Sequence, residues 1–315
     1  MRRPGWKVLC VATVFFAASV AFGRSPQDSA KNSSQDKSAP AAAAKGSDYA
    51  GSEACKTCHE EIYRGWEKSP HWRTTLNTKE GPGHQGCEGC HGAAASHVSD
   101  PSDTSKLFLF EKASTKEINE RCLTCHLKST TEQEHAINSI HAKNDVSCTS
   151  CHSPHHAKSE HLLASAQPGL CYSCHLGQKP QFDMPFHHRV NEGLVQCTDC
   201  HNPHGTERAH QLRTSATQDF VCFKCHTDKQ GPFVFEHEAV KMEGCQACHT
   251  PHGGPNPHML KVSNVNMLCL QCHTQSSFSG APGTPSFHNQ NSFFQACILC
   301  HSQIHGSNFN QFFFK

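Results

Sequence analysis

The sequence is poor in apolar residues for its length. Of its 315 residues, 36 % are hydrophobic, and the mean hydropathy is -0.58. No stretch shows the alternating pattern of a β-strand, and 17 prolines and 21 glycines interrupt the helical patterns. Outside residues 8–20, no stretch is apolar enough to span a bilayer as a helix. We therefore expect neither an ordinary hydrophobic core nor a regular sheet.

The N-terminal 48 residues are predicted to lie outside the folded domain. Met1–Gly23 has a basic start, an apolar run and a small-x-small cleavage site, as in a Sec signal peptide. A retained membrane anchor is the alternative, but the run is shorter than a typical span of ~20 residues. Arg24–Asp48 is rich in Ser, Ala, Lys, Gln and Asp without apolar periodicity, which predicts a disordered tether. Residues 49–315 remain as one domain.

Cysteine is abundant, with 21 residues, and 20 of them form ten copies of C-x-x-C-H. This is the attachment signature of c-type haem. The two thiols form thioethers with the haem vinyl groups, and the His becomes the proximal iron ligand. The predicted thioether residues are Cys55, Cys58, Cys87, Cys90, Cys122, Cys125, Cys148, Cys151, Cys171, Cys174, Cys197, Cys200, Cys222, Cys225, Cys245, Cys248, Cys269, Cys272, Cys297 and Cys300. The predicted proximal ligands are His59, His91, His126, His152, His175, His201, His226, His249, His273 and His301.

Two other readings of the motif fit less well. Zinc ribbons do not require a His after every second Cys, and no βαβ pattern typical of thioredoxin-like redox pairs surrounds any copy. The remaining cysteine, Cys10, lies in the N-terminal apolar run, so no thiol is left for a disulfide or a catalytic nucleophile. We therefore predict ten covalently bound haem c groups, whose porphyrins would supply the missing apolar surface.

The chain also lacks the positive charge that nucleic-acid binding requires. Its formal charge is +1, and loss of Arg2, Arg3 and Lys7 with the signal peptide takes it to -2. The haem propionates make the holoprotein more acidic. We therefore expect no nucleic-acid partner.

The motifs recur in pairs. Odd motifs begin at residues 55, 122, 171, 222 and 269, and even motifs at 87, 148, 197, 245 and 297, with later spacings of 47 to 52 residues in both series. We therefore predict a multihaem cytochrome c with five two-haem repeats, in which short helices and loops surround a linear chain of ten haems. Ser114–Glu117 predicts a capping box that opens one such helix into Cys122.

Ten further histidines lie in register with the ten motifs and are the predicted distal ligands. Those upstream of the even motifs are His71, His141, His187, His237 and His288. Those downstream are His97, His155, His204, His252 and His305. Alignment of His187-His188-Arg189-Val190 with His237-Glu238-Ala239-Val240 favours His187 over His188. Seven other histidines are predicted to lie at the surface or to contact propionates: His84, His135, His156, His161, His188, His210 and His258.

Spacing predicts which haem each distal His serves. Three residues span at most ~10–11 Å, which is too short to reach the opposite face of the same haem. We therefore expect His155, His204 and His252 to serve odd haems, and His204 to serve the haem at Cys171 or Cys222. The upstream His should complete the even haem of its own repeat.

Several motif-following sequences resemble those of the MtrA/DmsE family of periplasmic decahaem cytochromes. They are Cys200-His201-Asn202-Pro203-His204-Gly205, Cys248-His249-Thr250-Pro251-His252-Gly253-Gly254, Cys300-His301-Ser302-Gln303-Ile304-His305-Gly306 and Gly86-Cys87-Glu88-Gly89-Cys90-His91-Gly92. The resemblance covers about residues 49–315. It implies a bis-His haem wire in the periplasm, inserted in an outer-membrane β-barrel porin. Such a wire passes electrons between periplasmic and extracellular electron-transfer proteins, and its membrane association is through the porin only.

Two other functions stay open at the level of sequence. A multihaem oxyanion reductase needs an iron with an open position for substrate, whereas here every motif ends in His and further His are abundant. A filament-forming cytochrome would conduct by head-to-tail stacking of copies. The leading hypothesis is that the protein transfers electrons, has no catalytic residues and is not an enzyme.

We predict that all ten haems are six-coordinate and low-spin, with His on both faces. Ten His in register with the motifs are available as second ligands, whereas only four Met follow the signal peptide: Met184, Met242, Met259 and Met267. All-His ligation should also keep the potentials low, because Met ligation raises them. An EPR spectrum of the oxidised protein checks this, and a substantial high-spin signal would contradict it.

Overall fold

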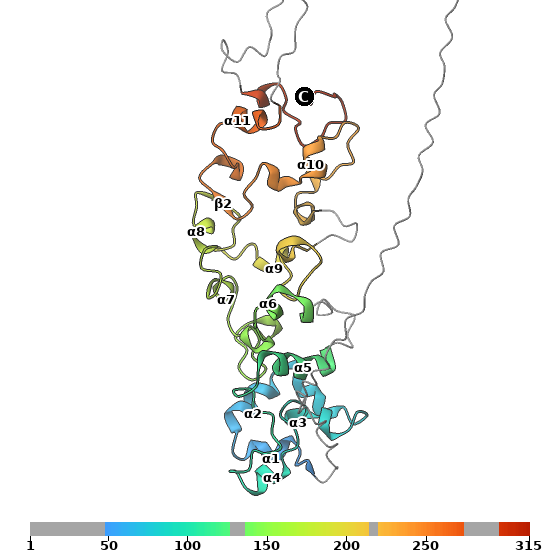
Figure 1. Ribbon diagram of the computed structural model, residues 1–315, viewed down its shortest axis with the longest axis vertical. Helices are drawn as coiled ribbons and strands as arrows, with labels where there is room; N and C mark the ends of the chain where they lie inside the picture. Colours follow the sequence, from blue (N-terminus) through green and yellow to red (C-terminus); the bar gives the residue numbers. More distant parts are fainter. Residues whose placement is uncertain (1–47, 127–135, 214–219, 274–295) are drawn as a thin grey trace, which may run out of the picture. The chain divides into compact units, whose positions relative to one another are not determined.

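The computed structural model describes residues 48–126, 136–213, 220–273 and 296–315 (Figure 1). They belong to one unit of the chain, Ala44–Lys315. The predicted signal peptide and all of the predicted tether except Asp48 lie outside the described residues, as does His288. These assignments stay predictions.

The described part of the chain is built of short helical segments, as predicted. The α-helices are α1 (Ser52–Lys56), α2 (Glu60–Glu67), α3 (Gly86–His91), α4 (Ala95–Ser99), α5 (Thr115–His126), α6 (Ile140–Lys143), α7 (Gly169–Tyr172), α8 (Lys179–Phe182), α9 (Cys197–Cys200), α10 (Glu238–Met242) and α11 (Val265–Leu270). The 3-10 segments are η2 (Pro70–Leu76), η3 (Pro82–His84), η5 (Cys148–Ser150), η6 (Glu160–Leu162), η7 (Ala209–Gln211), η8 (Val221–Lys224), η9 (Thr227–Lys229), η10 (Cys245–Ala247), η11 (Pro257–Met259) and η12 (Cys297–Leu299). Every C-x-x-C-H motif overlaps one of these segments.

The capping box at Ser114 is confirmed. The backbone N–H of Ser114 donates to the Glu117 carboxylate over 2.7 Å, and the N–H of Glu117 donates to Ser114 Oγ over 3.3 Å. These two bonds satisfy backbone donors that would otherwise be unpaired at a helix start. They open α5, whose 12 residues include Cys122 and end at the proximal-position His126.

The strands of the described residues are β1 (Phe186–His187) and β2 (Gly253–Gly254), which pair antiparallel. Their register places Phe186 opposite Gly254 and His187 opposite Gly253, close to α8 (Figure 1). A Cβ on Gly253 would lie 2.2 Å from the carbonyl oxygen of Gln181, so only glycine fits there. The pairing therefore connects the repeat that contains Cys171 with the loop after Cys248.

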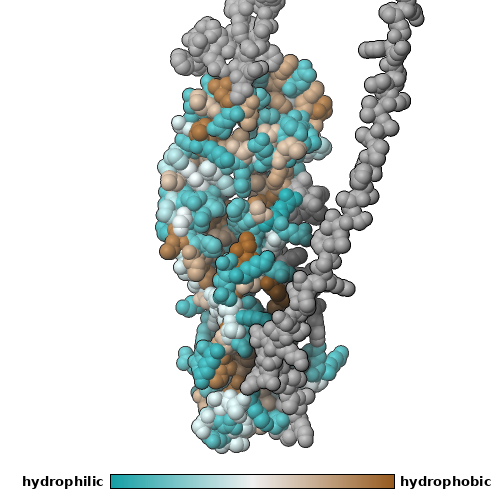
Figure 2. Space-filling model, viewed as in Figure 1, coloured by the Kyte–Doolittle hydropathy of each residue, from teal (hydrophilic) through white to brown (hydrophobic). Residues whose placement is uncertain are grey.

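The hydrophobic core of the described residues is small. Its members are Tyr63, Trp66, Ala93, Ala94, Ile118, Leu123, Phe182, Val190 and Phe223, and no large side chain among them is fully buried. On the face shown in Figure 2, hydrophobic residues lie in small groups among hydrophilic ones. Packing of apolar side chains is the main driving force of ordinary folding, so here the protein part alone supplies little of it.

In the first repeat, polar contacts supply part of the stabilisation. The Glu88 carboxylate is 3 % exposed and accepts hydrogen bonds from the backbone N–H groups of Ala50, Gly51 and Ala94 over 2.8 to 2.9 Å. A buried carboxylate is tolerated when it is hydrogen-bonded in this way. Glu88 therefore ties the start of the domain to the loop that follows His91.

None of the helices in the described ranges has the length and apolar character needed to cross a membrane.

We predict that residues 49–315 do not fold without haem. The nine buried apolar residues of the described ranges cannot offset the backbone entropy of those ranges, at about 1–2 kcal/mol per residue. The chain produced in the cytoplasm without the signal peptide should show a far-UV circular dichroism spectrum of a disordered chain and be cut rapidly by protease. The exported holoprotein is the control. Cooperative thermal unfolding of the haem-free chain would contradict the prediction.

Candidate haem-binding sites

The first cysteines of the two motifs in each repeat lie side by side. Their thiols lie close enough for one to shift the pKa of the other in five pairs: Cys55 with Cys87, Cys122 with Cys148, Cys171 with Cys197, Cys222 with Cys245, and Cys269 with Cys297. All twenty motif cysteines are described, and none of them forms a disulfide. The structure thus brings together the odd and even motifs that the sequence grouped into repeats.

The second cysteines connect one repeat to the next. The pKa of the Cys90 thiol is raised by burial and by the nearby Cys125 of the following repeat. The pKa of Cys248 is raised by burial and by Cys272 in the same way. Cys151 and Cys200 likewise lie near the next odd motif. Consecutive motifs are therefore spatial neighbours along the chain, alternately through their first and their second cysteines.

Nine of the ten motif histidines face a second His ring. The ring centroids of all nine pairs are 5.9 to 6.4 Å apart. The pairs are His59 with His97, His91 with His155, His126 with His71, His152 with His204, His175 with His141, His201 with His252, His226 with His188, His249 with His305, and His273 with His237.

This geometry fits two axial ligands of one metal better than it fits stacked rings. An imidazole nitrogen lies about 2 Å from a bound metal and the ring centre about 1 Å further, so two ligands place their centres ~6 Å apart. The interplanar angle ranges from 14° to 88°, although the distance hardly changes. Stacking would fix the angle between the ring planes. Ligation would instead fix the distance between the ring centroids and let each ring rotate about its bond to the metal. The residues present therefore fit bis-His haem.

Burial keeps several of these rings in the ligating form. The pKa values of His71, His91, His155, His252 and His305 are all lowered, in each case chiefly by burial. A lowered pKa favours the neutral imidazole, which is the form that binds a metal. The rings are therefore ready to ligate at neutral pH.

Hydrogen bonds between repeats hold the distal rings. His141 Nδ1 donates to the carbonyl oxygen of Pro203 over 3.0 Å, and His252 Nδ1 donates to the Gln181 side-chain oxygen over 3.0 Å. A hydrogen bond at Nδ1 leaves Nε2 as the ligating atom and orients the ring. These second partners lie 62 and 71 residues away in the sequence, so each ring is positioned by another repeat.

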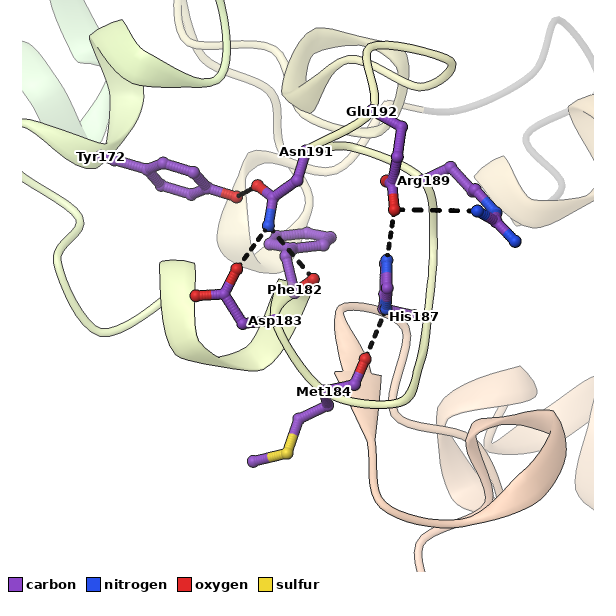
Figure 3. Close-up of polar contacts among 8 residues, drawn as sticks. All are labelled: Tyr172, Phe182, Asp183, Met184, His187, Arg189, Asn191 and Glu192. Atoms are coloured by element: carbon purple, nitrogen blue, oxygen red, sulfur yellow. Dashed lines mark hydrogen bonds and ion pairs between the residues drawn. The ribbon is translucent and has the colours of Figure 1, made fainter.

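The ring geometry favours His188 over the predicted His187. His188, not His187, faces His226, and its Nδ1 donates to the Pro251 carbonyl over 2.5 Å. Both nitrogens of His187 are occupied, Nδ1 by the Met184 carbonyl at 2.5 Å and Nε2 by Glu192 at 2.9 Å (Figure 3).

The direction of the His187 pKa shift agrees with this arrangement. The Glu192 carboxylate and the Met184 carbonyl raise the pKa of His187, which favours a ring with protons on both nitrogens. Such a ring has no lone pair for iron. The alignment with His237 misled because the His187 ring bonds to Glu192 and Met184 within its own loop, whereas the His188 ring reaches Pro251.

The facing rings also do not follow the predicted assignment of distal histidines to haems. Downstream histidines face even motifs: His155 faces His91 and His204 faces His152, one repeat back. Upstream histidines face the odd motif of the following repeat, as His141 does with His175. The argument that three residues cannot reach round one haem agrees with the structure. The predicted partner of each His differs from the facing ring because facing rings come from different repeats. Loop length within one repeat cannot reveal such a pairing.

The first repeat departs from this pairing of rings between repeats. No earlier repeat can supply a ring to His59, and His97 from the same repeat lies opposite it at 6.4 Å. At the other end, the predicted partner His288 lies outside the described residues. Phe314 packs against the His301 ring, with centroids 5.0 Å apart.

Comparison with known proteins supports the class that these sites define. The family model of the doubled CXXCH motif matches residues 141–180, 187–231 and 237–278, and that of cytochrome c554 and c-prime matches residues 54–86. The protein is a multihaem c-type cytochrome that transfers electrons and is not an enzyme. It is 31 % identical over 271 residues to the multihaem cytochrome MtrA of Shewanella baltica, covering 82 % of this chain and 79 % of that protein. The chain belongs to the MtrA family of multihaem cytochromes.

A paired substitution tests the corrected ligand. His188→Met should alter one haem, the one at Cys222, and raise its potential because Met replaces His as an axial ligand. His187→Met, its neighbour and matched control, should leave the spectrum unchanged. EPR together with a spectropotentiometric titration checks both variants. A change in His187→Met but not in His188→Met would restore the original assignment.

Proposed function

We propose that the protein is a decahaem wire in which each of the ten haem c groups is held by two thioethers and two His ligands. The haems supply one-electron redox chemistry when bound. The motif His is the proximal ligand, and the proposed distal ligands are His71, His97, His141, His155, His188, His204, His237, His252, His288 and His305.

The observation that carries this proposal is the set of nine facing His pairs with a common centroid separation. Each pair apart from His59 with His97 joins two repeats, so a ligand from one repeat completes the site of another. This interlocking holds successive motifs close together, which is the main structural requirement of electron transfer along a chain. A reductase would instead need an iron with an open position, and nine of the ten motif histidines already face a second ring.

We further propose that the wire works in the periplasm and passes through an outer-membrane β-barrel porin. The predicted signal peptide at Met1–Gly23 supports export, and the similarity to MtrA supports a conduit between periplasmic carriers and the cell surface. Electrons would be exchanged with other electron-transfer proteins at its two ends.

The conduit is testable in liposomes. The protein purified from outer membranes should bring a barrel protein with it, and the complex should let an external ferric chelate oxidise reduced methyl viologen trapped inside. A matched variant, Cys148→Ala with Cys151→Ala, removes one haem from the middle of the wire and should slow this transfer by orders of magnitude. Recovery of the protein without a barrel, or equal rates for the two forms, would contradict the proposal.

A further inference from the structure

Three pairs of consecutive residues adopt the left-handed backbone conformation at equivalent positions. They are His161-Leu162, His210-Gln211 and His258-Met259, with φ between 53° and 58°. The first member of each pair lies nine residues after a motif His. Non-glycine residues rarely adopt this conformation singly, and two in a row are more costly still. Backbone strain that recurs in register points to a function.

The strained residues place a carbonyl oxygen on the motif His ring. The Nδ1 groups of His152, His201 and His249 donate to the carbonyl oxygens of His161, His210 and His258 over 2.8, 2.8 and 2.9 Å. We call the segments 160–164, 209–213 and 257–261 carbonyl straps.

Two further backbone bonds fix each strap. In the strap at 209–213, Asn202 N–H donates to the Gln211 carbonyl over 2.8 Å, and Arg213 N–H donates to the Cys200 carbonyl over 2.8 Å. Ser153 and Ala164 make the equivalent bonds in the first strap, at 2.7 and 2.9 Å. The strap therefore binds directly to the C-x-x-C-H segment, and its carbonyl is part of a rigid local structure.

The two remaining even motifs have no strap of this kind. His301 Nδ1 donates to the Phe312 carbonyl over 2.5 Å, and the next residue, Phe313, is again left-handed with φ 61°. At the first even motif, the Phe108 N–H donates to the backbone carbonyl of His91 over 2.6 Å. In four of the five even motifs a carbonyl thus accepts from Nδ1 of the motif His.

The odd motifs differ. Within the described ranges, no carbonyl accepts from the rings of His59, His126, His175, His226 or His273, and these five residues are exposed whereas the even ones are half-buried. The two motifs of each repeat therefore offer their haems different surroundings.

A carbonyl that accepts from Nδ1–H makes the opposite nitrogen a stronger electron donor. A stronger donor stabilises the more positively charged, oxidised iron and lowers its reduction potential. We propose that the carbonyl straps lower the potentials of the haems at Cys148, Cys197 and Cys245, so that the wire alternates between haems with and without a strapped proximal ligand. The inference rests on the proposed His ligation. The side chains of His161, His210 and His258 are exposed, so the required feature is the backbone conformation.

The test changes the backbone preference at all three straps together. Valine disfavours the left-handed conformation because it is β-branched, whereas asparagine tolerates it. In His161→Val/His210→Val/His258→Val, about three tenths of the haem absorbance should titrate at higher potential. The expected change is about tenfold in the reduction equilibrium of each haem, or ~59 mV for one electron. The matched His161→Asn/His210→Asn/His258→Asn protein should titrate like the wild type.

A second variant keeps the inference testable if the valine protein does not fold. One glycine inserted between His210 and Gln211 moves a single carbonyl out of register without a strained side chain, and should shift about one tenth of the absorbance. Unchanged titrations of both the valine and the insertion proteins, with the low-spin EPR signal intact, would overturn the inference while leaving the wire. High-spin iron in the wild-type protein would instead overturn the proposed ligation, and the inference with it.

Discussion

The structure depends on one constraint: the two histidines that face each other come, with one exception, from different repeats. His204 lies opposite His152 and His188 opposite His226, so in the second to fourth repeats each motif His faces a ring from another repeat. Completing one site requires the neighbouring repeat to be in place. The bonds that would hold the iron would therefore also hold the repeats together, and ligation, more than side-chain packing, would set the distance between motifs.

This constraint explains how a chain with so small a core can be ordered. Few apolar side chains of the described residues are buried, and the first cysteines of the two motifs in each repeat lie close together. Covalent attachment shortens the loops available to the unfolded chain, and ligation ties distant segments together. Glycines fit where segments approach closely: a Cβ on Gly306 would lie 2.0 Å from the Phe233 ring.

Local signals predicted more than long-range ones. The capping box at Ser114, the short helices and the grouping of motifs in twos follow from residues close in sequence, and the structure bears them out. The partner of each ring does not, because it depends on contacts such as that of His188 with Pro251, 63 residues away. His187 and His188 are adjacent, yet His187 lies in β1 opposite Gly253 while His188 bonds to the Pro251 carbonyl. The carbonyl straps have one sequence signal that was overlooked: a second His follows three of the even motif histidines by nine residues.

The straps also show why strain is retained beside a site that has to be rigid. A flexible loop could offer a carbonyl to His201, but only some of the time, and the ring would rotate with it. The left-handed pair at His210 and Gln211 reverses the chain so tightly that two backbone bonds and the bond from the His201 ring all join it to one motif. Glycine would adopt the turn at less cost in the folded state but would lose more entropy on folding. Side chains at these positions therefore restrict the unfolded chain, and the closed backbone bonds hold the ring to one orientation.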